Sequence, residues 1–381
     1  MKKIWLLAAL LCFLWFHPLS AMAADKVERV YGMNRFQTAV QVAFKINSGT
    51  VESVVLANGW SFADALAGVP LAKQKKAPLL FVDDKVNNSW DALSYINKHL
   101  DRGGNIYLLG GTGVVPESFV DKFLEMGFER NKIHRLAGRD RYGTAVAIAW
   151  EIQHNGTEYF MASGENYPDA LSGSVLAAVL GDITHEQAAY QSAQGTLTYP
   201  ADGGVPLLLL PSDGSVPQSV VEYLNSVRVP RWLPKQFFNI LGGNGVIPQA
   251  TLDSLSRRVD RFGWIGRQLG GNDRYETMEA INRSGFEGYS GLAGKGYNVP
   301  HIYVAYGEDF PDALAGAVLA ALNHAPLVLV NESIPGPVRD LLSTYRYENA
   351  ESSSIATTLT VIGAPDTISE QTENELNALF D

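Results

Sequence analysis

Three arginines and three aspartates stand in two short phrases that the chain repeats three times. The arginine phrase has the form G-x-[N/D]-R-[Y/F]-x-T and contains Arg35, Arg141 and Arg274. The aspartate phrase reads SFADALAG, NYPDALSG or DFPDALAG and contains Asp64, Asp169 and Asp312. A guanidinium group is a planar fork of N–H donors that binds a carboxylate or a phosphate through two parallel hydrogen bonds. These six side chains could therefore bind one another, or an anionic ligand that lies across them.

The arginine phrase is expected to open a helix. The residue before each arginine is Asn34, Asp140 or Asp273, and Asn and Asp are strong N-cap residues. A cation in the first turn of a helix is electrostatically unfavourable, so an arginine there needs a nearby anion. Two partners fit: the aspartate of the same or the next unit, or an anionic group on a polymer. An earlier arginine in each unit could support the site, as Arg29, Arg135 and Arg267.

The aspartate phrase also predicts the start of a helix. Ser61, Asn166 and Asp309 are good N-cap residues, and the acid three positions later gives the spacing of a capping box. The small residues that follow, Ala-Leu-Ala/Ser-Gly, favour close packing of this helix on a sheet. A structural role explains most of the phrase, and direct ligand binding by the carboxylate is the alternative.

The elements that must position these phrases recur in a constant order. Short apolar runs predict strands, in the first unit at 53–57, 77–82 and 105–111. Helical spacing of apolar residues occurs around them, at 35–47, 64–74, 88–100 and 115–127. Apolar strands that alternate with helices indicate a parallel sheet covered on both faces. We therefore expect the α/β class, with three tandem units of parallel sheet packed in a pseudo-threefold arrangement.

The spacing of the phrases sets the unit boundaries. Arg141 lies 106 residues after Arg35, and Arg274 follows after a further 133 residues. The expected units are 27–133, 134–264 and 265–381. Three inserts are expected to be surface loops, because positions that tolerate extra chain lie at the surface; they fall at about 182–204, 284–300 and 347–354.

The N-terminus predicts export from the cell. Two lysines precede an apolar run of 13 residues, Ile4 to Phe16, and small residues follow, so residues 1–23 are expected to be a signal peptide. Cleavage would remove the single cysteine, Cys12, and two lysines, which takes the formal charge from −10 to about −12. An acidic exported chain without thiols has no disulfides and is a poor ligand for nucleic acid. We expect a secreted protein with no membrane contact after cleavage.

Together these motifs resemble a known family. The succession R-x-x-G-x-[N/D]-R-[Y/F]-x-T, D-A-L, P-L and G-G, three times in tandem, is similar to the type 2 cell wall binding repeat of clostridial and related Gram-positive surface proteins. The resemblance implies a Toprim-like or flavodoxin-like unit and three units in a trimeric arrangement. It implies non-covalent attachment to an anionic wall polysaccharide or a teichoic-acid-like polymer, with the three arginines and three aspartates as signature residues. The third unit departs from the pattern at Met278 and at VIGAPD, so its final loop is expected to be structural only.

The sequence lacks the common catalytic motifs. The histidines are scattered, without H-E-x-x-H spacing, and neither D-x-D nor G-x-S-x-G occurs. We expect a non-catalytic binding protein with no catalytic residue, no metal and no cofactor. Two rival hypotheses are a wall hydrolase associated with N-acetylmuramoyl-L-alanine amidase and a self-assembling surface-layer component. The sequence leaves the oligomeric state open.

Overall fold

The computed structural model describes residues 26–154, 156–192, 204–229, 235–287, 299–352 and 357–380. The expected signal peptide at 1–23 lies outside these ranges. Within them, no helix combines the length and the apolar character that a membrane span requires.

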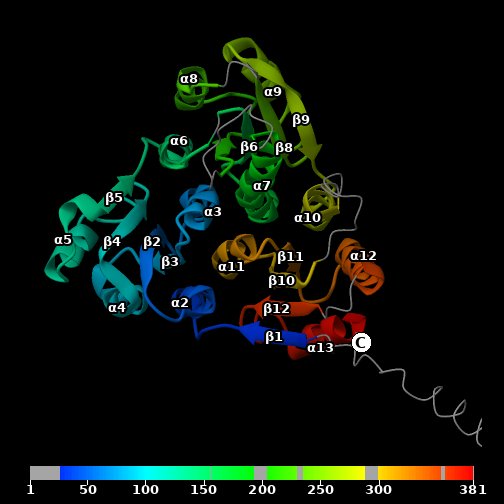
Figure 1. The fold of residues 1–381 in the computed structure, drawn as a ribbon, viewed down its shortest axis with the longest axis horizontal. Helices are drawn as coiled ribbons and strands as arrows, with labels where there is room; N and C mark the ends of the chain where they lie inside the picture. Colours follow the sequence, from blue (N-terminus) through cyan, green and yellow to red (C-terminus); the bar gives the residue numbers. More distant parts are fainter. Residues whose placement is uncertain are drawn as a thin grey trace, which may run out of the picture.

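Three four-stranded parallel sheets form the framework of the molecule (Figure 1). The first sheet has the order β3 (Leu79–Val82), β2 (Val51–Asn58), β4 (Leu100–Leu109) and β5 (Ile133–Leu136). The second has the order β7 (Leu207–Leu210), β6 (Glu158–Ser163), β8 (Gln236–Leu241) and β9 (Phe262–Leu269). The third has the order β1 (Lys26–Val30), β12 (Thr358–Ile362), β10 (His301–Tyr306) and β11 (Leu327–Val330). The predicted parallel α/β units are confirmed.

One strand of each sheet comes from the chain that leads into the next arginine phrase. β5 precedes the second arginine phrase but pairs with β4 of the first sheet, and β9 does the same in the second sheet. β1, at the start of the described chain, pairs in parallel with β12 near its end, with Val30 opposite Ile362. The three units are therefore linked strand by strand into a closed ring.

The helices form an inner and an outer set (Figure 1). The helices that carry the aspartate phrase lie at the centre: α3 (Ala63–Gln74), α7 (Pro168–Ser192) and α11 (Pro311–Leu322). Those that carry the arginine phrase are α2 (Arg35–Ile46), α6 (Arg141–Glu151) and α10 (Arg274–Asn282). The others are α4 (Trp90–His99), α5 (Ser118–Glu125), α8 (Gln218–Ser226), α9 (Gln249–Arg258), α12 (Gly336–Ser352) and α13 (Glu370–Phe380). Single turns complete the set: η1 (Val86–Asn88), η2 (Arg130–Lys132) and η3 (Arg283–Glu287).

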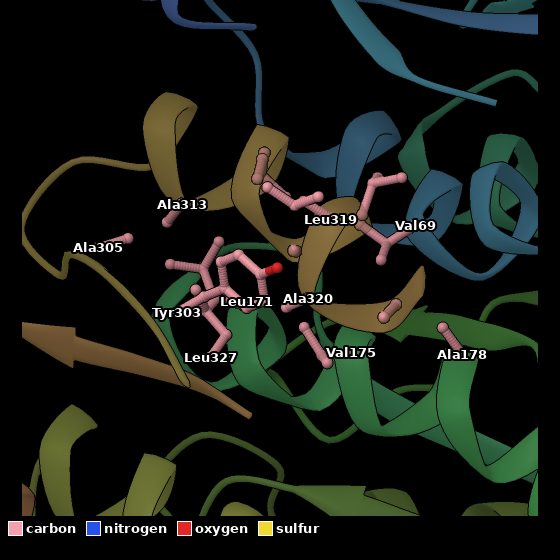
Figure 2. Packing of buried hydrophobic residues seen from close by; sticks show 14 of the residues in the cluster. Val69, Leu171, Val175, Ala178, Tyr303, Ala305, Ala313, Leu319, Ala320 and Leu327 are labelled. Atoms are coloured by element: carbon pink, nitrogen blue, oxygen red, sulfur yellow. The ribbon is translucent and has the colours of Figure 1, made fainter. Parts of the chain in front are cut away.

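The three inner helices pack against one another and fill the centre of the ring. Figure 2 shows apolar side chains from all three in contact, among them Val69 of α3, Val175 of α7 and Leu319 of α11. Residues 63–72 of α3 are all buried, and a helix that is apolar on every side is stable only when it is enclosed on every side. Each arginine helix packs on the inner helix of the preceding unit: α2 on α11, α6 on α3 and α10 on α7. This cyclic order confirms the predicted pseudo-threefold arrangement.

The glycine that ends each D-A-L-x-G motif permits this close packing, as the sequence predicted. A Cβ atom added at Gly68 would lie 2.4 Å from Leu109 Cδ1 of β4. The equivalent atom at Gly173 would lie 2.2 Å from Leu241, and at Gly316 it would lie 2.4 Å from Ile362. Each inner helix therefore touches its own sheet at a point where no side chain fits.

The inserts differ in part from the loops that were expected. The first continues α7 as helix through Ser192, and the third continues α12 through Ser352. Residues 182–192 contain no Gly or Pro, and the alanines and glutamines among them are good helix formers, so nothing ends the helix there. Most of the second insert, and the remainder of the other two, lie outside the described residues.

Candidate ligand-binding site at the repeat junctions

The predicted site residues meet at three junctions between successive repeats. Each junction contains the aspartate of one repeat and the glycine that follows its strand β4, β8 or β12, together with the arginine and threonine of the next repeat. The first junction comprises Asp64, Gly110, Arg141 and Thr144. The second comprises Asp169, Gly242, Arg274 and Thr277. The third, where the ring closes, comprises Asp312, Gly363, Arg35 and Thr38.

The aspartates are held away from water at these junctions. Burial raises the pKa of Asp64 to about 6, although the charge of Arg141 and a hydrogen bond with Thr144 act to lower it. Burial likewise raises the pKa of Asp312 to about 6, opposed by Thr38 and Arg35. Asp169 has a raised pKa for the same reason. The charge of the arginine of one repeat therefore acts on the aspartate of the preceding repeat at each junction.

The glycine on the other side of each carboxylate is constrained to be a glycine. Gly110 and Gly242 both have φ of +104°, and an added Cβ atom would lie 2.6 Å from Oδ2 of Asp64 or of Asp169. Gly363 has φ of +133°, and an added Cβ would lie 3.2 Å from Asp312 Oδ2. Only glycine adopts this backbone readily and leaves room for the carboxylate.

The expected capping box at the aspartate phrase is wrong. α3 and α11 begin one residue later in the phrase than expected, with Phe62 and Phe310 as N-cap residues, and neither has a capping side chain. Asp309 Oδ1 accepts a hydrogen bond from the N–H of Phe310, its immediate neighbour. The carboxylate of the phrase faces the next repeat across the junction, so it is not available to cap its own helix.

The caps expected at the arginine phrase are confirmed. Asn34 Oδ1 accepts from Gln37 N at 2.9 Å, and Asp140 Oδ1 accepts from Gly143 N at 2.8 Å. Asp273 Oδ1 accepts from Tyr275 N at 2.8 Å and from Glu276 N at 2.9 Å. These side chains fix the start of each arginine helix and therefore the position of the guanidinium that follows.

Each signature arginine bonds to its own repeat and lies over an aromatic ring of the preceding one. Its Nη1 donates to a glycine carbonyl at the end of a strand, from Arg35 to Gly59 at 2.9 Å, from Arg274 to Gly307 at 2.6 Å, and from Arg141 to Gly164. The guanidinium carbon lies 5.8–6.0 Å from a ring centroid in the pairs Arg35–Phe310, Arg141–Phe62 and Arg274–Tyr167. The arginines therefore also hold adjacent repeats together.

Those three aromatic residues form a cluster that sequence reasoning missed. The ring centroids of Phe62, Tyr167 and Phe310 are 5.5, 5.9 and 5.8 Å apart in the three pairs. The signal was present, because each aspartate phrase has an aromatic residue two positions before its aspartate. The cluster connects the three junctions, because each of its rings also lies beside the signature arginine of one junction.

Two of the three supporting arginines secure the glycine loop of a junction. Arg29 Nη1 donates to the carbonyl of Gly363 at 2.8 Å and its Nε to Glu373 at 2.7 Å. Arg135 donates to the carbonyl of Gly110 at 3.2 Å and to Glu117 at 2.9 Å.

Arg267 takes a different place from these two arginines. It lies one residue earlier in register, opposite Asn239 of β8, and donates to the carbonyl of Ser284 at 2.8 Å. Gln268, the next residue in β9, donates to Asn244 at 3.0 Å. The third repeat has one more residue between its supporting and its signature arginine than the other two repeats have. Because side chains alternate along a strand, this extra residue puts Arg267 on the opposite face of its strand from Arg29 and Arg135.

A pocket of about 630 Å³ lies at the third junction. It contains the predicted residues Asn34, Arg35 and Asp312. Its remaining walls come from both ends of the chain: Tyr31, Gly32, Met33, Thr38, Trp60, Tyr306, Asp309, Pro311, Ala364, Pro365, Asp366 and Thr367. The final loop of the third repeat, expected to be structural only, thus forms one wall of this pocket.

The chemistry of these junctions is that of recognition by hydrogen bonds and charge. Guanidinium and carboxylate groups converge with aromatic rings at each one, and the third provides an open volume. In the described ranges, no group of three or more His, Cys, Asp or Glu side chains is arranged to hold a metal ion.

The buried aspartates predict a pH-dependent stability that can be measured. Because the folded-state pKa of about 6 for Asp64 and Asp312 exceeds the ordinary value of 3.8, the folded chain binds protons more tightly than the unfolded chain. The free energy of unfolding should therefore fall as pH rises from about 4 to above 6, by about 1–3 kcal/mol for each carboxylate. In Asp64→Asn and Asp312→Asn this decline should be smaller, and urea unfolding at pH 4.5 and pH 7.5 measures it. Asp121→Asn, at an exposed position, is the control, and a decline equal to wild type in the two junction variants would contradict the assignment.

Comparison with known proteins places these repeats among characterised sequences. Residues 29–120, 135–252 and 268–373 match the sequence profile of the family described as Cell wall binding domain 2 (CWB2). The chain is 26% identical over 373 residues to N-acetylmuramoyl-L-alanine amidase LytC of Bacillus subtilis (strain 168), which covers 96% of this chain and 61% of the amidase. It is 23% identical over 366 residues to Amidase enhancer of the same strain, over 95% of this chain and 41% of that protein. The chain thus spans less than two thirds of the length of either relative.

Two solved structures from Clostridium difficile share the fold. Cwp8 superposes with a TM-score of 0.71 at 23% identity, over 93% of this chain and 52% of that chain. Cwp6 gives a TM-score of 0.70 at 22% identity, over 94% of this chain and 48% of that chain.

Proposed function

The chain belongs to the cell wall binding domain 2 family, and from this premise we propose that it attaches non-covalently to an anionic secondary polymer of a Gram-positive cell wall. The family supports wall binding and a place at the cell surface. The finer proposal assigns the polymer contacts to the three junctions. The residues proposed to make these contacts are Arg35, Asp64, Arg141, Asp169, Arg274 and Asp312, supported by Asn34, Asp140, Asp273, Arg29, Arg135 and Arg267.

The observation that carries the proposal is the threefold recurrence of one juxtaposition around a closed ring. Each junction sets an arginine of one repeat beside the aspartate of the preceding repeat, and the third does so through residues from opposite ends of the chain. A wall polymer repeats its chemical groups along its length, so one polymer can engage several equivalent sites. Linked weak sites exceed the affinity of one site by about 10²–10⁴. Catalysis would gain little from three such copies.

We propose that the chain acts by binding and not by hydrolysis. The similarity to LytC covers 61% of that amidase, so the activity in its name is not carried over to this chain. No catalytic residue, metal or cofactor is assigned to the junctions.

Co-sedimentation with purified Gram-positive walls, with and without their secondary polymers, tests the proposal. The chain should sediment with intact walls and stay in solution when the polymers have been extracted. Retention should weaken as salt rises from about 0.1 to 1 M, because the screening length falls from about 10 to 3 Å. Equal sedimentation with extracted walls would contradict the proposal. A cleared band in a wall zymogram would favour a hydrolase, and growth of particles without polymer in light scattering would favour self-assembly.

A further inference from the structure

The third junction differs from the other two at a pair of positions whose side chains contact each other. The residue after the strand-end glycine is Glu165 in the second repeat and Glu308 in the third, but Trp60 in the first. Glu308 pairs with Arg274 at 3.0 Å and accepts a hydrogen bond from Tyr275 at 2.6 Å. The first repeat lacks both the glutamate and the tyrosine of this arrangement. Trp60 stands in place of the glutamate, and Phe36 stands in place of the tyrosine.

The indole of Trp60 is both fixed in orientation and open to solvent. Its Nε1 donates to Asp83 Oδ2 at 3.0 Å, and its ring meets Phe36 edge to face at 5.7 Å between centroids. The guanidinium of Arg35 lies 4.5 Å from the ring centroid. Even so, 54% of Trp60 is exposed, and it lines the pocket of about 630 Å³. A held aromatic surface of this kind loses little conformational entropy when a flat apolar ligand face packs on it.

The rest of the pocket is suited to hydroxyl groups. Tyr31, 48% exposed, adds a second aromatic ring, and the third repeat supplies the carboxylates of Asp309, Asp312 and Asp366. Carboxylates accept hydrogen bonds and repel anions, and three of them outnumber the single guanidinium of Arg35. The pocket volume lies within the usual range of about 300–1,000 Å³ for ligand sites. Its chemistry favours an uncharged ring with one apolar face and several hydroxyl groups.

We propose that the pocket of the third junction binds an uncharged sugar ring of the wall polymer, with the apolar face of the ring packed on Trp60 and its hydroxyl groups donating to Asp309 and Asp366. This inference rests on the proposed function and specifies the ligand at one of its three sites. The anionic groups of the same polymer are then bound by the signature arginines. The third junction therefore adds recognition of a sugar ring to the recognition of charge that the arginines provide at all three junctions.

Substitutions at Trp60 test the inference in the whole chain. Trp60→Glu introduces the residue that the other repeats carry at this place, Trp60→Ala removes the ring, and Trp60→Phe retains a smaller ring. Trp150→Ala, at a tryptophan 58% exposed on α6 and away from the pocket, is the matched control. The glutamate and alanine variants should bind walls about fivefold to tenfold more weakly, and the phenylalanine variant and the control less than about threefold.

A competition experiment gives a second and independent measurement. Glycans released from the walls that retain the protein are separated by ion exchange into neutral and anionic fractions. The neutral fraction should displace the wild-type chain from walls and change its tryptophan emission, and the emission change should be absent in Trp60→Phe. Wild-type chain that does not sediment with walls would contradict the proposed function itself. Wild-type chain that sediments while Trp60→Glu and Trp60→Ala sediment equally well, or that only the anionic fraction displaces, would overturn this inference alone.

Discussion

A chain that begins at Tyr31 is expected to be several kcal/mol less stable than one that begins at Lys26. The truncation removes β1, whose backbone pairs along its whole length with β12. It also removes the buried side chain of Val30 and the bonds of Arg29 to Gly363 and Glu373. The loss of a strand together with a partly buried ion pair should cost on the order of 3–5 kcal/mol, at the upper end of the range for local changes. β12 would still pair with β10 but would become the edge strand of its sheet, and an exposed edge is prone to association with other chains.

Urea unfolding followed by far-ultraviolet circular dichroism measures this effect. The chain that begins at Lys26 is the control, because it differs only in the five residues of β1. The truncated chain should also show weakened wall binding at low temperature, where it is still folded, because Gly363 N bonds to the carbonyl of Val30 beside the third junction. Equal urea midpoints for the two chains would show that the pairing of β1 with β12 does not hold the ring closed.

Replacement of Arg35, Arg141 and Arg274 together by alanine is expected to lower the affinity for walls by at least about 100-fold. Each removes one cationic group from a junction, and loss of all three removes the gain from linked sites, about 10²–10⁴. Single and double variants should fall between wild type and the triple variant. The dependence of binding on salt should become weaker with each arginine removed, because fewer charges are screened.

The matched control is a second triple variant with the same change of charge. Arg228, Arg257 and Arg346 are exposed and lie away from the junctions, and their replacement by alanine should alter wall binding less than about threefold. Because the signature arginines also bond to glycine carbonyls, circular dichroism and urea midpoints must accompany the binding data. A folded triple variant that binds walls as well as wild type would show that the arginines serve only to join the repeats.

Much of the fold could be predicted because the local signals are strong. Apolar runs such as 53–57, and the small residues that end at Gly68, specify a buried strand and an inner helix without reference to distant residues. The caps at Asn34, Asp140 and Asp273 were predictable for the same reason, since a cap depends on residues three positions away.

What could not be predicted depends on contacts between repeats. β1 and β5 are short and mixed in polarity, as KVERV and IHRL, and nothing in them indicates which sheet they join. Asp64 has the spacing of a capping residue, but its carboxylate faces Thr144 of the next repeat, and that contact exists only once the first two repeats have packed together. The open pocket at the third junction had no separate signal, because its walls come from residues 31–38, Trp60 and 306–367.

Hydrogen–deuterium exchange with and without polymer released from walls tests the central claim most directly. The account predicts that bound polymer slows amide exchange in the arginine phrases, 32–38, 138–144 and 271–277, and in the segments that run from the strand-end glycine to the signature aspartate, 59–64, 164–169 and 307–312. The amides of α4, α9 and α13, which lie outside these phrases, should exchange at unchanged rates. Slowed exchange confined to those helices, or at one junction with no effect at the other two, would contradict a ring of three polymer-binding junctions.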